Sequence, residues 1–391
     1  MKTFKKVGIA VLSMAMAFGM TACGNKEGGK EPAPATSGAE TSQAEASSTA
    51  ATTTEGGKTY EVGVAIYQYN DNFMTSYRKE LEKYFKELGE KDGNTYNVEF
   101  QDGKNDQATQ TEQLNNFIQQ GKDVIIANLV DPTGADQIIN SAKGHNIPVV
   151  LINREPRSTE TMNIWPGKTT YVGVDARQSG TYQGEIIADL PNHGDVNGDG
   201  KVSYLMIMGD AGNVDAEQRT QYSIEALQKV IPAEILGEAQ RGNWDEAKGQ
   251  EIAANALSQY GEKLEVIFSN NDGMAKGAKN AIDAAKRTVG KDIYIVGVDA
   301  LPEVVEMIGQ GQFTGTVLND AFNQSHTAAE IAVKLLQGED VKPYYWHDYV
   351  KVTKPEEAEV KRLQPKEETI EEYTKRIETT YGTSADSKSE K

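Results

Sequence analysis

Cysteine and histidine are scarce in this chain, which has one Cys and four His among 391 residues. A single Cys excludes a disulfide framework, a zinc site ligated by several Cys and a CxxC redox pair. Four scattered His leave little room for a His-rich metal centre. The phosphate-binding pattern GxxxxGK[ST] and the nucleophile motif GxSxG are also absent. These absences argue against a Cys- or His-based metalloenzyme, a thiol redox enzyme, a P-loop nucleotide hydrolase and a hydrolase with a GxSxG nucleophile.

Basic residues are outnumbered, with 40 Lys and Arg against 58 Asp and Glu and a formal net charge of −18. Because this surplus repels phosphate backbones, nucleic acid is not an expected partner. No nucleophile–base pair stands out, so we expect a protein that is not an enzyme. Paired carboxylates such as Asp71 and Asp215 leave glycoside hydrolysis as the enzymatic alternative.

Long apolar runs are missing as well, and the longest near the start, Val7–Gly19, has 13 residues. A bilayer span takes about 20 residues, whereas this run, preceded by three Lys, suits a secretory signal peptide. Small residues then precede Cys23, a pattern that resembles the lipobox of bacterial lipoproteins. We predict a signal peptide over residues 1–22 and a lipid anchor on Cys23 at the extracytoplasmic face of the cell membrane. The alternative is an ordinary signal peptide with an incidental Cys.

Strand and helix patterns alternate from residue 60 onward, which is typical of parallel sheets flanked by helices. The units are too many for one sheet, so we predict an α/β protein with two doubly wound parallel-sheet domains joined by a three-segment hinge. The expected strands are Glu61–Ile66, Val124–Ala127, Pro148–Ile152, Thr170–Val174, Val202–Met208, Leu264–Phe268, Ile293–Val298 and Thr314–Leu318. The expected helices are Met74–Leu88, Gln107–Gln119, Gly180–Leu190, Ala216–Val230, Glu246–Tyr260, Ala275–Lys286 and Asn323–Leu336.

The domain boundaries follow from composition and from this alternation. Residues 23–58 are rich in Ala, Ser, Thr, Gly and Glu and carry no aromatic residue before Tyr60, which predicts a disordered tether. We assign residues 59–148 and 320–347 to an N-terminal domain, and residues 149–319 and 348–378 to a C-terminal domain. The charged end of the chain predicts a peripheral helix near Glu367–Ile377 and a disordered tail over residues 379–391.

Polar side chains follow the predicted strands at the point where each strand ends. In open α/β sheets, ligands bind outside the carboxyl ends of the strands, so these residues predict one cleft between two domains. Each of them could alternatively cap a helix. The residues are Asp71, Asn128, Asp215, Asn271, Asp299 and Asn319.

Aromatic residues and one arginine complete the chemistry of this cleft. Carboxylates accept hydrogen bonds from hydroxyls, amides both donate and accept, and the Arg219 guanidinium donates several. Phe73 and Trp244 offer faces that pack against the C–H groups of a pyranose ring. This mixture favours a neutral ligand dense in hydroxyl groups, which indicates a sugar.

Six motifs in order resemble the galactose/glucose-binding members of the type I periplasmic-binding-protein family. They begin at Tyr67, Asn128, Asp215, Asn270, Gly297 and Thr316. The resemblance implies that Phe73 and Trp244 sandwich the sugar, which hydrogen-bonds to Asp71, Asn128, Asp215, Arg219, Asn271, Asp299 and Asn319. It further implies a monomeric binding protein that delivers galactose or glucose to the permease of an ABC importer.

The chain departs from the family at Asn213, where the family has a sugar-contacting His. Asn can still donate a hydrogen bond, so we expect sugar binding to persist with an altered preference between glucose and galactose.

Residues 195–203 follow the pattern of an EF-hand calcium loop, with oxygen-bearing residues at alternate positions and a turn glycine. The twelfth position is Met206 rather than Glu, so a complete shell needs a carboxylate from elsewhere. The family resemblance implies that Glu265 supplies it and that the Ca²⁺ is structural. The predicted ligands are Asp195, Asn197, Asp199, Lys201, Ser203 and Glu265, and the alternative is a loop without metal.

Two other functions remain open at this point. The same body could serve as a lipid-anchored sensory receptor for chemotaxis or signalling with no role in transport. It could also bind another monosaccharide, such as a pentose, in the same fold.

Overall fold

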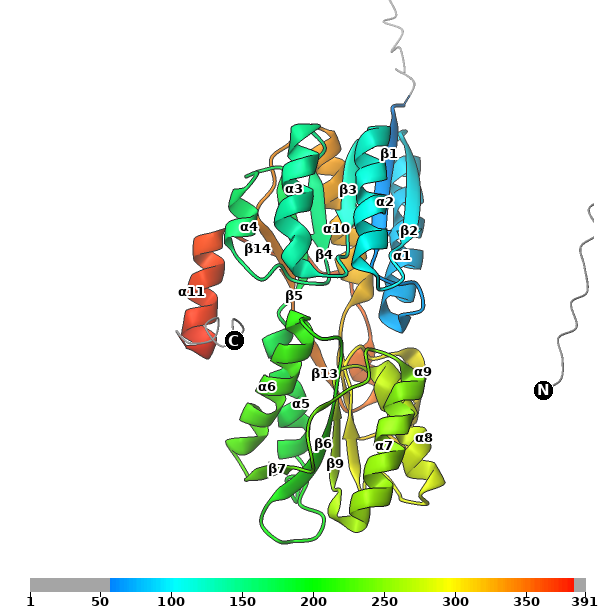
Figure 1. The fold of residues 1–391 in the computed structure, drawn as a ribbon, viewed down its shortest axis with the longest axis vertical. Helices are drawn as coiled ribbons and strands as arrows, with labels where there is room; N and C mark the ends of the chain where they lie inside the picture. The colour runs from blue at the N-terminus through cyan, green and yellow to red at the C-terminus, as the bar shows by residue number, and fades with distance from the viewer. Residues whose placement is uncertain (1–56, 383–391) are drawn as a thin grey trace, which may run out of the picture. The chain divides into compact units, whose positions relative to one another are not determined.

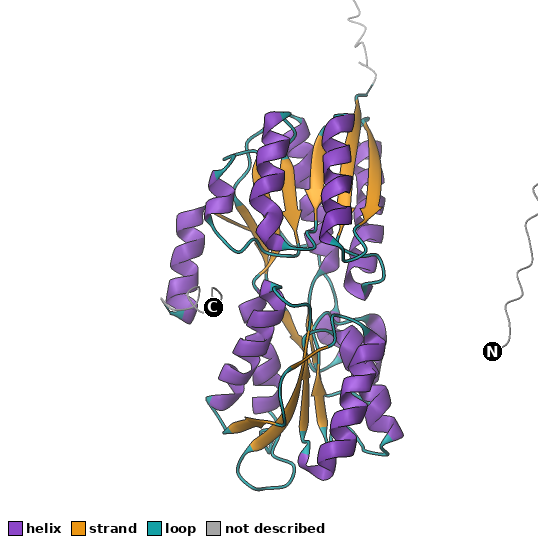
Figure 2. Ribbon diagram, viewed as in Figure 1, coloured by secondary structure: helices purple, strands orange, loops and turns teal. Residues whose placement is uncertain are grey.

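The computed structural model describes residues 57–382. The predicted signal peptide, Cys23, most of the tether and residues 383–391 of the predicted tail lie outside this range. The last helix extends to Tyr381, so the predicted start of a disordered tail at residue 379 is wrong. The described chain contains two main parallel sheets of seven and five strands, each flanked by helices, which confirms the predicted fold class (Figures 1 and 2). In the described range, no helix combines the length and apolar character that a membrane crossing requires.

The seven-stranded sheet forms the first lobe and has the strand order β14-β12-β5-β4-β3-β1-β2. All neighbours pair in parallel except β14, which is antiparallel to β12. Its strands are β1 (Thr59–Ile66), β2 (Thr95–Asp102), β3 (Val124–Ala127), β4 (Val149–Ile152), β5 (Thr169–Val174), β12 (Tyr344–His347) and β14 (Lys366–Glu368). Its helices are α1 (Asn72–Asp92), α2 (Gln107–Gln120), α3 (Ala135–Gly144), α4 (Glu160–Asn163), α10 (Ala321–Leu336) and α11 (Ile370–Tyr381), with the 3₁₀ turn η1 (Pro132–Gly134).

The five-stranded sheet forms the second lobe and has the order β10-β9-β6-β7, with the short β8 also paired to β6. The strands are β6 (Val202–Met208), β7 (Ala233–Ile235), β8 (Gln240–Arg241), β9 (Val266–Ser269) and β10 (Tyr294–Val296), beside the antiparallel pair β11 (Thr316–Leu318) and β13 (Val350–Val352). The helices are α5 (Ala176–Ala188), α6 (Val214–Gln228), α7 (Glu246–Tyr260), α8 (Asp272–Ala284) and α9 (Pro302–Gly309), with the 3₁₀ turns η2 (Gly261–Lys263) and η3 (Pro355–Ala358).

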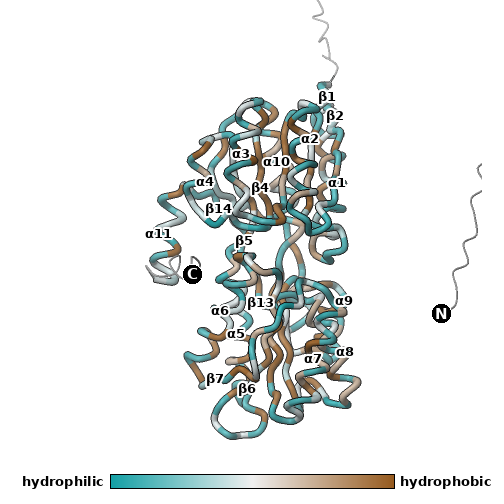
Figure 3. Tube along the Cα trace, viewed as in Figure 1, coloured by the Kyte–Doolittle hydropathy of each residue, from teal (hydrophilic) through white to brown (hydrophobic). Residues whose placement is uncertain are grey.

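The central strands of each sheet are buried on both faces and are continuous apolar runs, as expected for parallel sheets, whereas the edge strands β2, β7 and β14 are partly exposed. In the first lobe, α1 and α10 pack on one face and α2 and α3 on the other. In the second lobe, α7, α8 and α9 cover one face and α5 and α6 cover the other. Figure 3 shows the hydrophobic colouring concentrated along the strands of the second lobe.

Short polar side chains begin most of the helices that follow strands. In each case the side-chain oxygen accepts a hydrogen bond from a backbone N–H in the first helical turn, which satisfies a group that the helix itself leaves unpaired. The capping residues are Asp71, Asp106, Asp175, Asn213, Asp245, Asn271 and Asp320. Some residues predicted to line the cleft, such as Asp71 and Asn271, therefore also cap helices.

The sheets correct two of the predicted domain boundaries. Strands β4 and β5, which lie after residue 148, pair with β3 and with each other in the first lobe. The boundary drawn at 148 is therefore wrong, because the chain leaves the first sheet only after Val174. Strand β14 also belongs to the first sheet, so the assignment of all of residues 348–378 to the second domain is wrong.

The chain passes between the two lobes four times rather than through the three predicted segments. The passages lie between β5 and α5, between β11 and α10, between β12 and β13, and between η3 and β14. The fourth exists because β14 returns to the edge of the first sheet beside β12.

Candidate functional site

A cavity lies where the carboxyl ends of the strands of both lobes meet, as the strand-end residues predicted. Nine of the ten predicted sugar-binding residues line it. Its lining consists of Tyr67, Asp71, Phe73, Asn153, Arg154, Asn213, Asp215, Arg219, Trp244, Asn271, Asp299 and Asn319.

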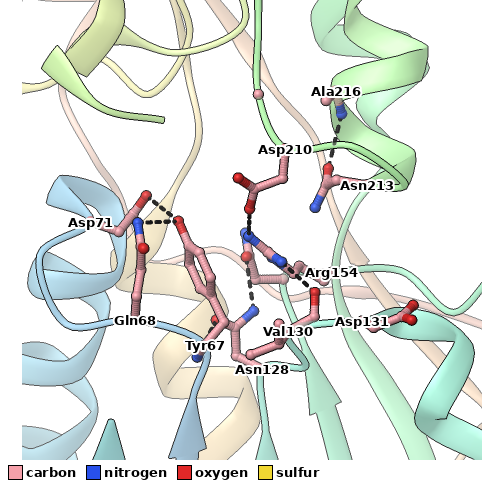
Figure 4. Close-up of polar contacts among 12 residues, drawn as sticks. Tyr67, Gln68, Asp71, Asn128, Val130, Asp131, Arg154, Asp210, Asn213 and Ala216 are labelled. Atoms are coloured by element: carbon pink, nitrogen blue, oxygen red, sulfur yellow. Dashed lines mark hydrogen bonds and ion pairs between the residues drawn. The ribbon is translucent and has the colours of Figure 1, made fainter. Parts of the chain in front are cut away.

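Asp71 and Tyr67 form one wall, contributed by the end of β1. The Tyr67 hydroxyl donates to Oδ2 of Asp71 at 2.8 Å (Figure 4). Oδ1 of Asp71 accepts from the Met74 backbone N–H at 2.6 Å. The carboxylate is therefore fixed by a helix cap on one side and a phenol on the other. Phe73, in the first turn of α1, is buried beside them.

Asn128 is the predicted contact that does not line the cavity. It is fully buried, and its Nδ2 donates to Oδ1 of Asn153 at 3.0 Å while its Oδ1 accepts from the Tyr67 N–H at 3.4 Å. It therefore holds Tyr67 and Asn153 in place, and these two residues line the cavity instead.

Arg154 joins the two lobes across the cavity. Its Nη2 lies 2.8 Å from Oδ2 of Asp210, which follows β6 in the second lobe, and its Nη1 donates to the Val130 carbonyl at 2.7 Å (Figure 4). The guanidinium carbon lies 3.6 Å from the centroid of the Tyr67 ring. Since both charged side chains are nearly buried, this ion pair belongs to a closed arrangement of the lobes.

Arg219 is the central cation of the second-lobe wall. Its Nη1 donates to the Asn270 carbonyl and its Nη2 to the Tyr349 hydroxyl, both at 2.9 Å. Oδ2 of Asp215, one helical turn earlier on α6, lies 3.8 Å from Nη2. The guanidinium is thus held rigidly with one edge toward the cavity.

Trp244 occupies the loop between β8 and α7 and packs against the cores of both lobes. Asn243 and Trp244 have φ values of 50° and 63°, a left-handed conformation that Asn adopts readily but that is strained for Trp. A Cβ atom at Gly209 would lie 2.0 Å from the indole ring, so glycine is required there for the ring to lie on the backbone. The strained backbone and the required glycine together fix the position of the indole ring.

Two predicted amides serve as helix caps at the edge of the cavity. Oδ1 of Asn213 accepts from the Ala216 N–H at 2.9 Å, and Oδ1 of Asn271 accepts from the Met274 N–H at 3.0 Å (Figure 4 shows the first). Because each oxygen is used by the helix, the Nδ2 group is what each residue can offer a ligand. Both residues therefore act as donors.

Asp299 and Asn319 form a hydrogen-bonded pair that follows β10 and β11. Nδ2 of Asn319 donates to Oδ1 of Asp299 at 3.2 Å, and Oδ1 of Asn319 accepts from Nε2 of Gln324 at 2.7 Å. Asp299 itself has a φ of 123°, another unusual backbone conformation in the cavity wall. The pair leaves Oδ2 of Asp299 as an acceptor.

Burial dominates the electrostatics of the three cavity carboxylates. It raises the pKa of Asp71 and of Asp215, and it raises the pKa of Asp299 well above its ordinary value. Arg219 acts in the opposite direction on both Asp215 and Asp299. The cavity thus contains three carboxylate acceptors. The negative charge of each one lowers the stability of the protein unless a hydrogen-bond donor contacts it.

Three buried polar atoms of the lining have no hydrogen-bond partner within the protein: Oδ1 of Asp215, Nε of Arg219 and Nε1 of Trp244. Such buried atoms are ordinarily paired, because each unpaired one costs about 1–3 kcal/mol. One acceptor and two donors around one cavity fit a ligand that both donates and accepts.

The loop over residues 195–203 folds around carboxylates. Oδ1 and Oδ2 of Asp195 accept from the N–H groups of Gly198 and Gly200 at 2.6 and 2.9 Å. Glu265, which is fully buried, accepts from the N–H groups of Val196 and Ser203, both at 2.8 Å. Glu265 therefore lies beneath the loop, although among residues 57–382 no three Asp, Glu, His or Cys side chains are grouped to hold a metal ion as they stand.

Sequence reasoning missed Tyr67, Asn153 and Arg154. All three follow β1 or β4 directly, so the strand-end rule that found the other residues contained the signal for them. The boundary predicted at 148 assigned β4, and with it Asn153 and Arg154, to the second domain, whereas Tyr67 stood in the first motif without a role of its own.

A model of the periplasmic binding protein domain matches residues 62–340 of the chain. The D-galactose/methyl-galactoside binding periplasmic protein MglB of Haemophilus influenzae is 39% identical over 282 residues, which cover 71% of this chain and 82% of that protein. The ribose import binding protein RbsB of Bacillus subtilis is 28% identical, covering 73% of this chain and 84% of the relative.

Solved structures show the same architecture. An ABC transporter solute binding protein from Bacillus halodurans, determined with bound myo-inositol, aligns with a TM-score of 0.67 and 27% identity. The alignment covers 78% of this chain and 98% of that one.

Proposed function

Since the chain belongs to the periplasmic binding protein family, whose members bind solutes and are not enzymes, we propose that it captures D-galactose or D-glucose in the cavity between its lobes. We further propose that the closed complex delivers the sugar to an ABC importer. The observation that carries the proposal is the set of unpaired buried atoms on Asp215, Arg219 and Trp244, which line the same cavity.

The lining suits a neutral polyhydroxylated ring. Acidic and amide groups dominate over cations, so an anionic ligand would meet more repulsion than attraction. Phe73 and Trp244 supply two apolar surfaces from opposite lobes, which fit the two faces of a pyranose. The relative named for galactose and methyl-galactoside binding supports a hexose over a pentose.

Closure follows from the distribution of these groups between the lobes. A ligand that contacts Asp71 in the first lobe and Asp215 in the second lowers the free energy of the closed form only. The Arg154–Asp210 ion pair adds a contact between the lobes themselves. Sugar binding and lobe closure are therefore coupled.

Calorimetric titration of the purified protein tests the proposal. Galactose, glucose, methyl-galactoside, ribose, xylose and myo-inositol form the panel. We expect one-to-one binding of a hexose at least about 100-fold tighter than ribose, because buried groups left unpaired by a smaller sugar lower its affinity. A response to a pentose alone would retain the fold and overturn the hexose assignment. If no sugar of the panel gave a binding signal, the proposal of sugar capture would be overturned and another ligand would be favoured.

Asn213 is expected to set the balance between glucose and galactose. Replacing it with His exchanges a donor that also caps α6 for a longer ring, so we expect the ratio of the two affinities to change by about fivefold or more. The matched control is Asn163→His, at an exposed residue of α4 outside the cavity lining. An unchanged ratio in Asn213→His would show that this residue does not contact the sugar.

We also propose a structural Ca²⁺ in the loop over residues 195–203. Asp195, Asn197 and Asp199 from the loop and the buried Glu265 beneath it offer the hard oxygen ligands that Ca²⁺ prefers, and Lys201 offers its carbonyl. Ser203 has a short side chain, so we assign it at most a contact through water. Ca²⁺ would stabilise the folded second lobe by binding to it alone.

Glu265→Gln tests the Ca²⁺ proposal by thermal unfolding. We expect Ca²⁺ at about 100 times its Kd to raise the melting temperature of the wild type by about 5 °C, and this increment to be lost in the variant. Glu234→Gln is the control, because Glu234 pairs with Lys201 at the exposed edge of the loop. An equal loss of stability with Ca²⁺ and with chelator would remove the ligand role of Glu265.

The predicted location remains part of the proposal, since Cys23 is outside the described residues. The family is extracytoplasmic, and we propose that a lipid on Cys23 holds this member at the cell membrane. Intact-mass measurement of protein extracted from the membrane tests it: an acylated chain beginning at Cys23 is expected, and an unmodified Cys23 would contradict it.

A further inference from the structure

The last part of the described chain, β14 and α11, forms a segment that we name the C-terminal strap (residues 366–381). It lies beyond the region matched by the family model, which ends at residue 340. We propose that Tyr373, Arg376 and Tyr381 of the strap are positioning residues that favour closure of the lobes around the ligand. The inference rests on the proposed function for its ligand but concerns an element outside the cavity.

The strap is anchored firmly to the first lobe. β14 pairs with β12, and the Tyr373 ring lies 5.3 Å from that of Trp346 with an angle of 11° between their planes. Tyr373 and Ile377 are both buried against the core of this lobe. The strap therefore moves with the seven-stranded sheet.

Arg376 connects the strap to the first passage between the lobes. Its Nη1 lies 2.8 Å from Oδ2 of Asp175, the residue between β5 and α5 that caps α5. Its Nε lies 2.8 Å from Oε1 of Glu368, so the guanidinium is held from two sides. Asp175 is nearly buried, so the contact is screened less than an exposed ion pair, and Asp175 also pairs through Oδ1 with Arg177 at 3.0 Å.

The strap also touches a second passage and the second lobe itself. Nζ of Lys366 lies 2.6 Å from Oδ2 of Asp348, between β12 and β13. At the far end, the Tyr381 ring packs edge-on against Tyr222 of α6, with centroids 5.1 Å apart. One short segment thus bridges a strand of the first lobe and a helix of the second.

A further contact leads from the strap toward the cavity. The Tyr373 hydroxyl donates to Oε1 of the buried Glu155 at 2.5 Å. Glu155 directly follows Arg154, which lines the cavity and pairs with Asp210 across the lobes. Tyr373 therefore restrains the backbone that carries the interlobe ion pair.

These contacts are present in the closed arrangement that the Arg154–Asp210 pair defines. Contacts made from the first lobe to α6 and to Asp175 stabilise this arrangement, so removing them shifts the equilibrium toward the open form. Because the strap does not line the cavity, we expect its removal to raise the dissociation rate constant of the sugar more than it changes the association rate constant.

Arg376→Met and Tyr381→Ala in the full chain test this inference, with Lys375→Met and Glu378→Ala as controls on the exposed face of the same helix. Stopped-flow kinetics with the tightest-binding sugar of the panel measure both rate constants, and dyes placed on α2 and α7 report the distance between the lobes without sugar. We expect the dissociation rate to rise about fivefold in each strap variant. The association rate should change less than twofold, and the unliganded closed fraction should fall.

Tyr373→Phe adds a conservative variant that keeps the ring stack and removes only the bond to Glu155. We expect a smaller rise in the dissociation rate, because the anchor to the first lobe persists. Unchanged dissociation and unchanged lobe distance in Arg376→Met and Tyr381→Ala would overturn the inference. If the wild type binds no sugar, the proposed function fails, and the dye distances without sugar still decide the role of the strap.

Discussion

Trp244→Ala is expected to weaken hexose binding by at least about 100-fold, or about 2.7 kcal/mol. The indole packs against the cores of both lobes and lies on the backbone at Gly209, so its removal opens the cavity and deletes one stacking face. Its unpaired Nε1 is lost with it. Calorimetric titration measures the change.

Trp165→Ala is the matched control for this variant. Trp165 is a partly buried side chain that packs in the first-lobe core, away from the cavity lining. We expect it to lower thermal stability and leave hexose affinity within about twofold of the wild type. Equal affinities in Trp244→Ala and the wild type would contradict the stacking role.

Asp299→Asn is expected to have opposite effects on binding and on stability. The carboxylate is 7% exposed, and burial raises its pKa well above the ordinary value. An amide of the same shape avoids the cost of the buried charge but loses a charged acceptor for a sugar hydroxyl. We expect affinity to fall about 100-fold and the melting temperature of the unliganded protein at pH 7 to rise by about 2 °C.

The pH dependence of that stability gain has a defined sign. A carboxyl whose pKa is raised in the folded state contributes stability below the unfolded pKa, and this contribution is lost as the pH rises through the folded pKa. The variant should therefore gain most over the wild type at pH 7 to 8, and the gain should shrink toward pH 4. Asp131→Asn, on an exposed capping residue, is the control and should show no such gain. A gain independent of pH would contradict the account.

Much of the site was accessible from the sequence because parallel strands end at one edge of a sheet. Asp71, Asp215, Asn271, Asp299 and Asn319 follow strands in the printed order, and the fold brings them to one cavity. Their residue types already indicate hydrogen bonding to hydroxyl groups.

Other features depend on contacts between distant segments. Asn128 follows a strand like its neighbours, yet its amide is consumed by Tyr67 and Asn153, which only the packing of β1, β3 and β4 determines. The pairing of Arg154 with Asp210 spans two lobes. No local pattern reveals either arrangement.

Two strands of the first sheet escape sequence-based prediction for a similar reason. β2 (Thr95–Asp102) was not predicted because it is an edge strand with polar alternation, and β14 is a short charged segment that pairs only because β12 offers an edge. Local propensity is weak in both, so the tertiary pairing decides their structure.

Tryptophan fluorescence during sugar titration tests the central claim most directly, with Trp244→Phe measured alongside the wild type. The chain has three Trp, and only Trp244 lines the cavity. We predict a saturable change with galactose or glucose in the wild type, and its loss in Trp244→Phe even at sugar concentrations that calorimetry shows to be saturating. A hexose signal that persists unchanged in Trp244→Phe would place the binding event elsewhere and contradict a sugar site between the lobes.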